Sequence, residues 1–250
     1  MTCSLRHAPG SRLKFRGVCS RSRVFPLVAL CLLLSSQCAA AGTQEDFRVW
    51  SNLTAITNLG SLNPDLSRWR WWLEGQGRFR ESGGVPDQGL ARTGLGYALA
   101  ENVSVWLGYA YIAGFPDAGG TDDEHRLWQQ LTWSASRPWG DVSSRARLEQ
   151  RFLEGVDEAG WRFREQLRFS RPVIQGGPLS YVAWDEVFIH LNTVSPSIRS
   201  GFDQNRGFAG FGYAFNKEAR AELGYLNQFI ATQARDRMNH ILSLSLFLTF

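Results

Sequence analysis

The chain ends in the stretch Ile241–Phe250, which reads Ile-Leu-Ser-Leu-Ser-Leu-Phe-Leu-Thr-Phe. Leucine alternates with serine from Leu242 to Leu246, and an aromatic residue closes the chain. Successive side chains of a β-strand point to opposite faces, so this stretch predicts a strand with one apolar and one polar face. A terminal strand of this kind, ending in an aromatic residue, is typical of β-barrels of the bacterial outer membrane.

The same alternation recurs upstream in segments of about ten residues, the length of a tilted membrane-spanning strand. The segments are Phe47–Thr57, Trp69–Arg80, Leu90–Leu99, Val103–Ala113, Arg126–Ser136, Val142–Phe152, Trp161–Phe169, Leu179–His190, Gly207–Phe215, Ala219–Phe229 and Ile241–Phe250. Short breaks such as Asn216–Glu218 alternate with long ones such as Gly114–His125 and Leu191–Arg206. This pattern predicts periplasmic turns and outer loops, with the C-terminus on the periplasmic side.

The segments also predict the number of strands. The segments from Trp69 onward make ten strands, which can close an antiparallel up-and-down barrel with both termini periplasmic. Single-chain bacterial barrels have even strand numbers, so Phe47–Thr57 does not fit as an eleventh. We therefore predict an all-β transmembrane barrel of ten strands. The alternative is twelve strands with one partner missed; otherwise Phe47–Thr57 lies in the lumen or along the wall.

The faces of the strands indicate which side meets lipid. In Trp69–Arg80, Trp71 and Leu73 lie opposite Arg70 and Glu74. A soluble barrel would bury the apolar face, whereas a membrane barrel turns it outward and keeps the lumen polar. Aromatic residues near the strand ends and a secretory leader favour the membrane barrel. Outer-membrane lipid is then the surrounding medium, and the assembly machinery is the expected partner of the strand ending at Phe250.

Residues 1–41 have the pattern of a cleaved secretory signal peptide, which leaves 42–250 as the barrel. A basic region precedes the apolar run Val24–Leu34, and small residues at Ala39–Ala41 suit a cleavage site. All four cysteines lie in the leader, as do six of the 27 Lys and Arg residues. The mature chain then has a formal net charge of −2, which argues against a nucleic-acid partner. Without cysteine it offers no thiolate chemistry, and we expect neither cofactor nor metal.

The predicted lumen is rich in arginine, and acidic residues answer only some of them. Its charged lining is Arg70, Glu74, Arg78, Arg80, Arg126, Arg145, Arg147, Glu149, Arg151, Arg162, Arg164, Arg168, Arg206, Arg220 and Glu222. One interpretation is structural, because Arg–Glu ladders fill a narrow barrel and satisfy buried charge. The other is an electropositive interior that admits anions. A narrow barrel favours the first.

Catalysis is the third hypothesis, since some small outer-membrane barrels are hydrolases or acyltransferases. The mature chain contains only His125, His190 and His240, and no Gly-x-Ser-x-Gly motif. The run Asp122–His125 could hold a metal, but such a cluster is more often a solvated loop that marks the start of a strand, and we favour that interpretation. We therefore predict a protein that is not an enzyme.

Short motifs spread along the chain resemble a family of outer-membrane barrels known as domain of unknown function 2490. They are Trp50, Glu74, Arg78, Glu124-His125-Arg126, Trp128-Gln129-Gln130, Arg147–Arg151, Arg162-Phe163-Arg164, Asp203–Arg206, Gly224-Tyr225, Gln228 and Asn239-His240. Their order and spacing, rather than any one motif, carry the resemblance. It implies a barrel in the outer membrane and no assigned activity. The predicted function is thus a structural envelope barrel with an Arg/Glu-filled lumen; the alternatives are a narrow anion-preferring channel and a surface lipid- or lipopolysaccharide-modifying enzyme.

Overall fold

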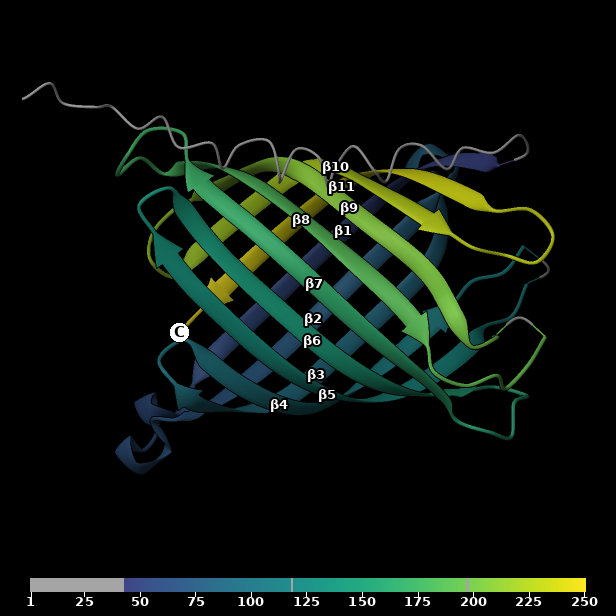
Figure 1. The fold of residues 1–250 in the computed structure, drawn as a ribbon, viewed down its shortest axis with the longest axis horizontal. Helices are drawn as coiled ribbons and strands as arrows, with labels where there is room; N and C mark the ends of the chain where they lie inside the picture. Colours follow the sequence, from purple (N-terminus) through teal and green to yellow (C-terminus); the bar gives the residue numbers. More distant parts are fainter. Residues whose placement is uncertain (1–42, 118, 197) are drawn as a thin grey trace, which may run out of the picture. The chain divides into compact units, whose positions relative to one another are not determined.

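The chain folds into a closed β-barrel (Figure 1). The computed structural model describes residues 43–117, 119–196 and 198–250; the predicted signal peptide lies outside these ranges. Eleven strands form in the described residues: β1 (Gln44–Asn58), β2 (Trp69–Arg80), β3 (Val85–Ala100), β4 (Val103–Gly114), β5 (Asp122–Arg137), β6 (Gly140–Leu153), β7 (Gly160–Pro172), β8 (Leu179–His190), β9 (Gly201–Ala214), β10 (Ala219–Ile230) and β11 (Arg237–Thr249). The all-β prediction is confirmed.

The predicted strand number was wrong, as was its alternative of twelve. The segment Phe47–Thr57 is neither a plug nor half of a missed hairpin, because it belongs to β1, which closes the barrel. One edge of β1 pairs antiparallel with β2 and the other pairs parallel with β11, placing Leu53 opposite Leu246. The closing seam is thus the parallel one in an otherwise antiparallel barrel. The predicted number was wrong because it assumed that a bacterial barrel has an even number of strands.

The parallel seam also determines the rim at which β1 begins. Gln44 pairs with Arg237, the first residue of β11, whereas Phe250 hydrogen-bonds Ile56 and Asn58 near the end of β1. The start of β1 and the end of the chain therefore lie at opposite rims. The prediction that both termini share one side was wrong for the barrel, because an odd number of strands reverses the direction of the first.

Connections differ between the two rims. We call the rim that holds Phe250 the turn rim and the opposite one the loop rim. Tight turns join β3 to β4 and β5 to β6 at the turn rim, although the β1–β2 connection there carries two 3₁₀ turns, η1 (Leu59–Ser61) and η2 (Pro64–Leu66). The loop rim carries a third, η3 (Glu81–Gly83), and the connections β4–β5, β6–β7, β8–β9 and β10–β11. No helix in the described residues is long and apolar enough to cross a membrane.

The strands are strongly staggered, as barrel closure requires. Following paired residues around the barrel from Asn58 leads back to Gln44 at the other end of the same strand. A stagger of this size tilts strands by roughly 35–45° to the barrel axis. The diagonal course of the ribbons in Figure 1 shows the tilt.

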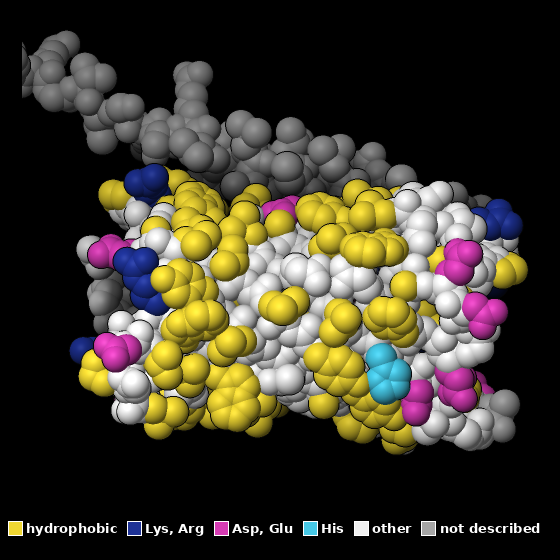
Figure 2. All heavy atoms as spheres, turned by 90° about the horizontal axis from the view of Figure 1, so that it is seen from below, with side chains coloured by type: hydrophobic (Ala, Val, Ile, Leu, Met, Phe, Trp, Pro, Cys, Tyr) yellow, Lys and Arg dark blue, Asp and Glu magenta, His cyan; other side chains and the backbone are white. Residues whose placement is uncertain are grey.

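The outer surface of the barrel is apolar along its middle. Large hydrophobic side chains that remain exposed include Leu73, Leu107, Leu167, Leu223 and Leu244. On the face shown in Figure 2, hydrophobic side chains cover the central region, and most charged ones gather toward the two ends. The predicted outward positions of Trp71 and Leu73, and of Leu242, Leu244 and Leu246 in β11, are confirmed by this exposure.

Polar side chains on the outer face pair with one another. Gln129 and Gln150, on neighbouring strands, exchange two amide hydrogen bonds of 3.1 and 2.9 Å. Ser144 donates to Glu165 at 2.6 Å. Because a paired polar group costs much less to place in an apolar surrounding than an unpaired one, these residues do not interrupt the apolar surface strongly.

Glycines make room for tryptophans inside the turn-rim half of the barrel. A Cβ built on Gly94 or Gly108 would lie within 2.6 Å of the Trp128 ring, and one on Gly96 would lie 2.4 Å from Trp106. Trp72, Trp106 and Trp128 pack edge to face in a cluster of buried residues. The three rings therefore occupy space that the glycines leave open inside the barrel.

Candidate functional site

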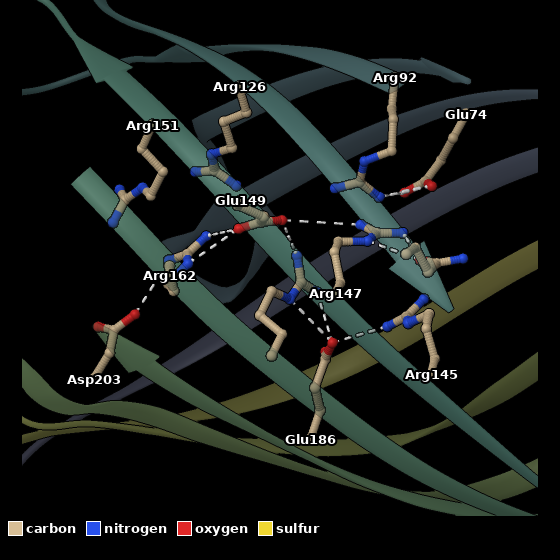
Figure 3. A network of polar contacts seen from close by, with 12 residues as sticks. Glu74, Arg92, Arg126, Arg145, Arg147, Glu149, Arg151, Arg162, Glu186 and Asp203 are labelled. Carbon is tan, nitrogen blue, oxygen red and sulfur yellow. Dashed lines mark hydrogen bonds and ion pairs between the residues drawn. The ribbon is translucent and has the colours of Figure 1, made fainter. Parts of the chain in front are cut away.

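Glu149, on β6, is the centre of the charged network in the lumen (Figure 3). Its side chain is 1% exposed. It accepts hydrogen bonds of 3.1 and 2.7 Å from Arg162 and one of 2.7 Å from Arg164. The Arg147 guanidinium lies 3.9 Å away. One carboxylate thus answers three arginines, two of them on β7, and ties β6 to its neighbour across the lumen side of the sheet.

Glu186, on β8, extends the network toward the opposite side. It accepts hydrogen bonds from Arg164 at 3.1 and 2.8 Å and from Arg145 at 2.9 Å. Arg164 therefore bridges Glu149 and Glu186. A separate buried pair joins Arg92 to Glu74, at 2.8 and 2.9 Å.

Arg147 links the ion pairs to the aromatic cluster. Its guanidinium stacks 4.6 Å from the Trp128 ring centre and 6.0 Å from that of Trp72. It donates two hydrogen bonds to Gln130, at 2.8 and 2.5 Å. Arg147 is 1% exposed, so water does not compensate its charge. The cation–π contacts, the Gln130 amide and Glu149 together stabilise the buried guanidinium.

The turn-rim half holds a further ion-pair cluster. Arg168 forms a bidentate pair with Glu222 at 2.9 and 2.6 Å, and Arg220 approaches the same carboxylate at 3.1 Å. Arg220 is exposed. Glu222 is buried.

A cavity of about 1150 Å³ occupies the loop-rim half of the lumen, and we call it the vestibule. Loop residues Pro116, Arg199 and Gln233 line its upper part, and Arg92, Arg164 and Phe188 line its floor. Among the residues that the structure describes, eleven arginines and six acidic residues line it. The vestibule is therefore strongly cationic, and the Glu149 network and the tryptophans lie beneath it.

Glu124 lies inside the vestibule, so the interpretation of Asp122–His125 as a solvated loop was wrong for this residue. The run opens β5, and alternation sends Glu124 inward. Arg126 holds the carboxylate with bonds of 2.6 and 2.7 Å, and Arg151 holds it with bonds of 2.5 and 3.1 Å. No cluster able to hold a metal ion occurs in the described residues.

The three histidines in the described residues occupy two kinds of surroundings. His125 and His240 face outward and hydrogen-bond Tyr109 and Tyr225, at 2.5 and 2.6 Å. His190 is buried at the vestibule, with its Nε2 atom 3.4 Å from Asp203. Asp203 also accepts a hydrogen bond of 3.1 Å from Arg162, so this carboxylate belongs to the lumen network.

Comparison with known proteins identifies the family. A family model described as a protein of unknown function, DUF2490, matches residues 47–239. The chain belongs to this family. An uncharacterised protein of Methylorubrum extorquens is 34% identical over 230 residues, which cover 90% of this chain and 96% of the relative. No solved structure matches the chain.

The predicted lumen residues of this DUF2490 barrel fall into five groups. The central network contains Arg145, Arg147, Glu149, Arg162 and Arg164, while Arg126, Arg151, Arg78, Arg80 and Arg206 line the vestibule. Glu74 pairs with Arg92 on the neighbouring strand. Arg168, Arg220 and Glu222 form the turn-rim cluster, and Arg70, on β2, has no ion pair within the described part of the chain.

Several lumen residues were missing from the predicted set. Arg48 pairs with Asp46 and Asp87 at 2.8 and 2.7 Å near the loop rim. Trp50 and Trp128 point inward, among the charges. The glycines opposite Trp128 were an available signal, because glycines on two adjacent strands indicate space reserved for a large neighbour.

Proposed function

We propose that this protein is an integral β-barrel of the bacterial outer membrane with a structural role in the envelope. The closed barrel, the apolar outer surface and the terminal strand ending at Phe250 support this placement. In this proposal the outer-membrane lipid surrounds the barrel, and the assembly machinery engages β11. The proposed topology turns the loop rim outward, as in other barrels with long outer loops.

The observation that carries the structural role is the buried network around Glu149. Arg147 and Glu149 are each 1% exposed, and Trp128 is fully buried beside them. A lumen packed with ion pairs and rings offers no aqueous path for a hydrated ion. A buried ion pair is strongly destabilised when one partner is removed. The network therefore fixes the relative positions of β5 to β8 rather than guiding a solute.

Planar-bilayer recording tests this role. The wild-type protein should insert without producing channel steps. A matched variant, Trp128→Ala, removes the ring that fills the lumen and should raise the frequency of open steps. Steady anion-selective conductance by the wild type would overturn the structural role and favour the second candidate. That candidate, a narrow anion-preferring channel, is supported by the excess of arginine over acid in the vestibule.

We propose no catalytic role. His125 and His240 are engaged by tyrosines on the outer face, and Asp203 is shared between His190 and Arg162. Incubation of the folded barrel with phospholipid or lipopolysaccharide should leave both unmodified; a product that His190→Gln abolishes would overturn this proposal.

A further inference from the structure

Two of the vestibule arginines that are not exposed differ from the other unexposed ones in their partners. Arg78, on β2, donates to Gln88 at 2.6 Å and to Gln76 at 2.8 Å. Arg206, on β9, donates to Gln204 at 3.2 Å. Within the described part of the chain, neither guanidinium forms an ion pair with a carboxylate. The hydrogen-bond partners of both guanidiniums are therefore neutral amides.

Trp50 brings these two cations together. The guanidinium carbon of Arg78 lies 4.2 Å from the Trp50 ring centre, and that of Arg206 lies 4.9 Å from it. Two cations over one ring are separated by no more than the sum of these distances. Cation–π attraction offsets part of their repulsion but adds no negative charge.

The neighbouring carboxylates, Asp87 and Glu186, form ion pairs with other arginines. Asp87 accepts from Arg48 at 2.7 Å and lies 3.7 Å from Arg80. Glu186 is shared by Arg145 and Arg164. Asp87 and Glu186 therefore act on Arg78 and Arg206 only from beyond ion-pair distance within the described part of the chain.

Arg206 is buried and Arg78 is half-buried, and both line the vestibule. Arg206 is 9% exposed, and the Nε atom of Arg78 is buried without a hydrogen-bond partner. Trp50 also lines the cavity, and its indole Nε1 has no partner either. Both nitrogens are buried within the cavity wall, where a donor without an acceptor is costly. Here they converge on one wall.

The same wall carries amides that are already held in place. Gln228 donates to Gln204 at 2.6 Å, and Asn239 donates to Gln228 at 2.9 Å. This chain of amides fixes the Oε1 atom of Gln204, which accepts the hydrogen bond from Arg206. A fixed guanidinium is a planar, preorganised receptor for carboxylate or phosphate oxygens.

We infer that Arg78 and Arg206, held on Trp50, form a binding site for the oxyanion group, carboxylate or phosphate, of a small molecule entering the vestibule. The inference deepens the proposed function and rests on it only in turning the loop rim outward. The ligand would bind above the Glu149 network and would not cross the lumen.

Titration of the folded full-length barrel in detergent, by calorimetry at low ionic strength, tests the site. Inorganic pyrophosphate and citrate serve as the phosphate and carboxylate probes. At least one should bind saturably to the wild type. Gln88→Glu and Gln204→Glu each supply an internal carboxylate to Arg78 or Arg206, so each should weaken binding about 10- to 100-fold. Both variants should also unfold at a higher urea concentration than the wild type without ligand.

Gln130→Glu is the matched control, because it makes the same change beside Arg147, outside the vestibule. It should leave probe affinity within about two-fold of the wild type, since Arg147 does not line the cavity. Absence of saturable binding by both probes would overturn the site, as would equal weakening in the control. Channel activity of the wild type would instead overturn the structural role alone, so the two failures are distinguishable.

Discussion

Removing the charge of Glu149 should destabilise the barrel more than any other single carboxylate-to-amide change in the lumen. The isosteric change Glu149→Gln takes a charged partner from Arg162, Arg164 and Arg147 at once. Arg164 retains Glu186, and Arg162 retains Asp203. Arg147 loses its carboxylate neighbour altogether and keeps Gln130 and the Trp128 ring.

The expected magnitude follows from what remains buried. Removing one partner of a buried pair costs about 3–5 kcal/mol, because an uncompensated charge stays in a low-dielectric surrounding. We expect a loss of that size in the free energy of unfolding, measured by urea titration of the barrel folded into liposomes. Glu218→Gln, on the exposed β9–β10 turn, is the control and should change stability by about 0.5 kcal/mol or less.

A second variant separates charge imbalance from lost packing. Arg147→Met removes the cation left without a partner, so the double variant Arg147→Met/Glu149→Gln should recover part of the loss. Glu149→Gln with wild-type stability, or a double variant whose losses simply add, would refute the claim that the carboxylate balances buried charge.

Three further changes test the barrel itself. Leu244→Arg on the exposed face of β11 should lower stability in liposomes by about 2–4 kcal/mol if the residue lies near the bilayer midplane, whereas an unchanged or more soluble protein would argue against membrane insertion. Deleting Phe250, whose backbone bonds Ile56 and Asn58 across the seam, should reduce the heat-modifiable folded fraction on gels, and normal folding would show that the terminal residue is dispensable. The pair Ser51→Cys/Leu244→Cys should form a disulfide on oxidation because these residues are register partners; Ser51→Cys/Leu223→Cys, one strand further away, should not, and the reverse result would reject the parallel seam.

Alternation predicted the strands well because both faces of a barrel wall impose it. The polar or charged position recurs every second residue in β2, β6 and β7, where Glu74, Glu149 and Arg164 all point inward. The strands extend further at the loop rim than predicted: β5 begins at Asp122 rather than Arg126. Charged residues at strand starts look like loops in a sequence, yet here Glu124 faces an interior that neutralises it.

The strand number and the tryptophan cluster depend on contacts distant in sequence. Whether Phe47–Thr57 closes the barrel is decided by its pairing with β11, some two hundred residues later, and no local pattern encodes that choice. Alternation places Trp71 on the outer face and Trp72 on the inner face, but it does not reveal which side chains Trp72 packs against. Trp72 is buried because its ring packs edge to face against those of Trp106 and Trp128.

Incomplete pairing of an arginine does not by itself indicate a ligand site, and Arg147 shows why. It too receives an amide and an aromatic ring, but it is sealed among Trp72, Trp128 and Gln130, where no solute can reach it. Arg78 and Arg206 share its chemistry yet face a cavity. In a barrel selected for packing alone, a glutamate at position 88 or 204 would relieve the buried charge through a single change of side chain. The presence of Gln88 and Gln204 instead keeps two cations available in the vestibule, and that availability is what an oxyanion requires.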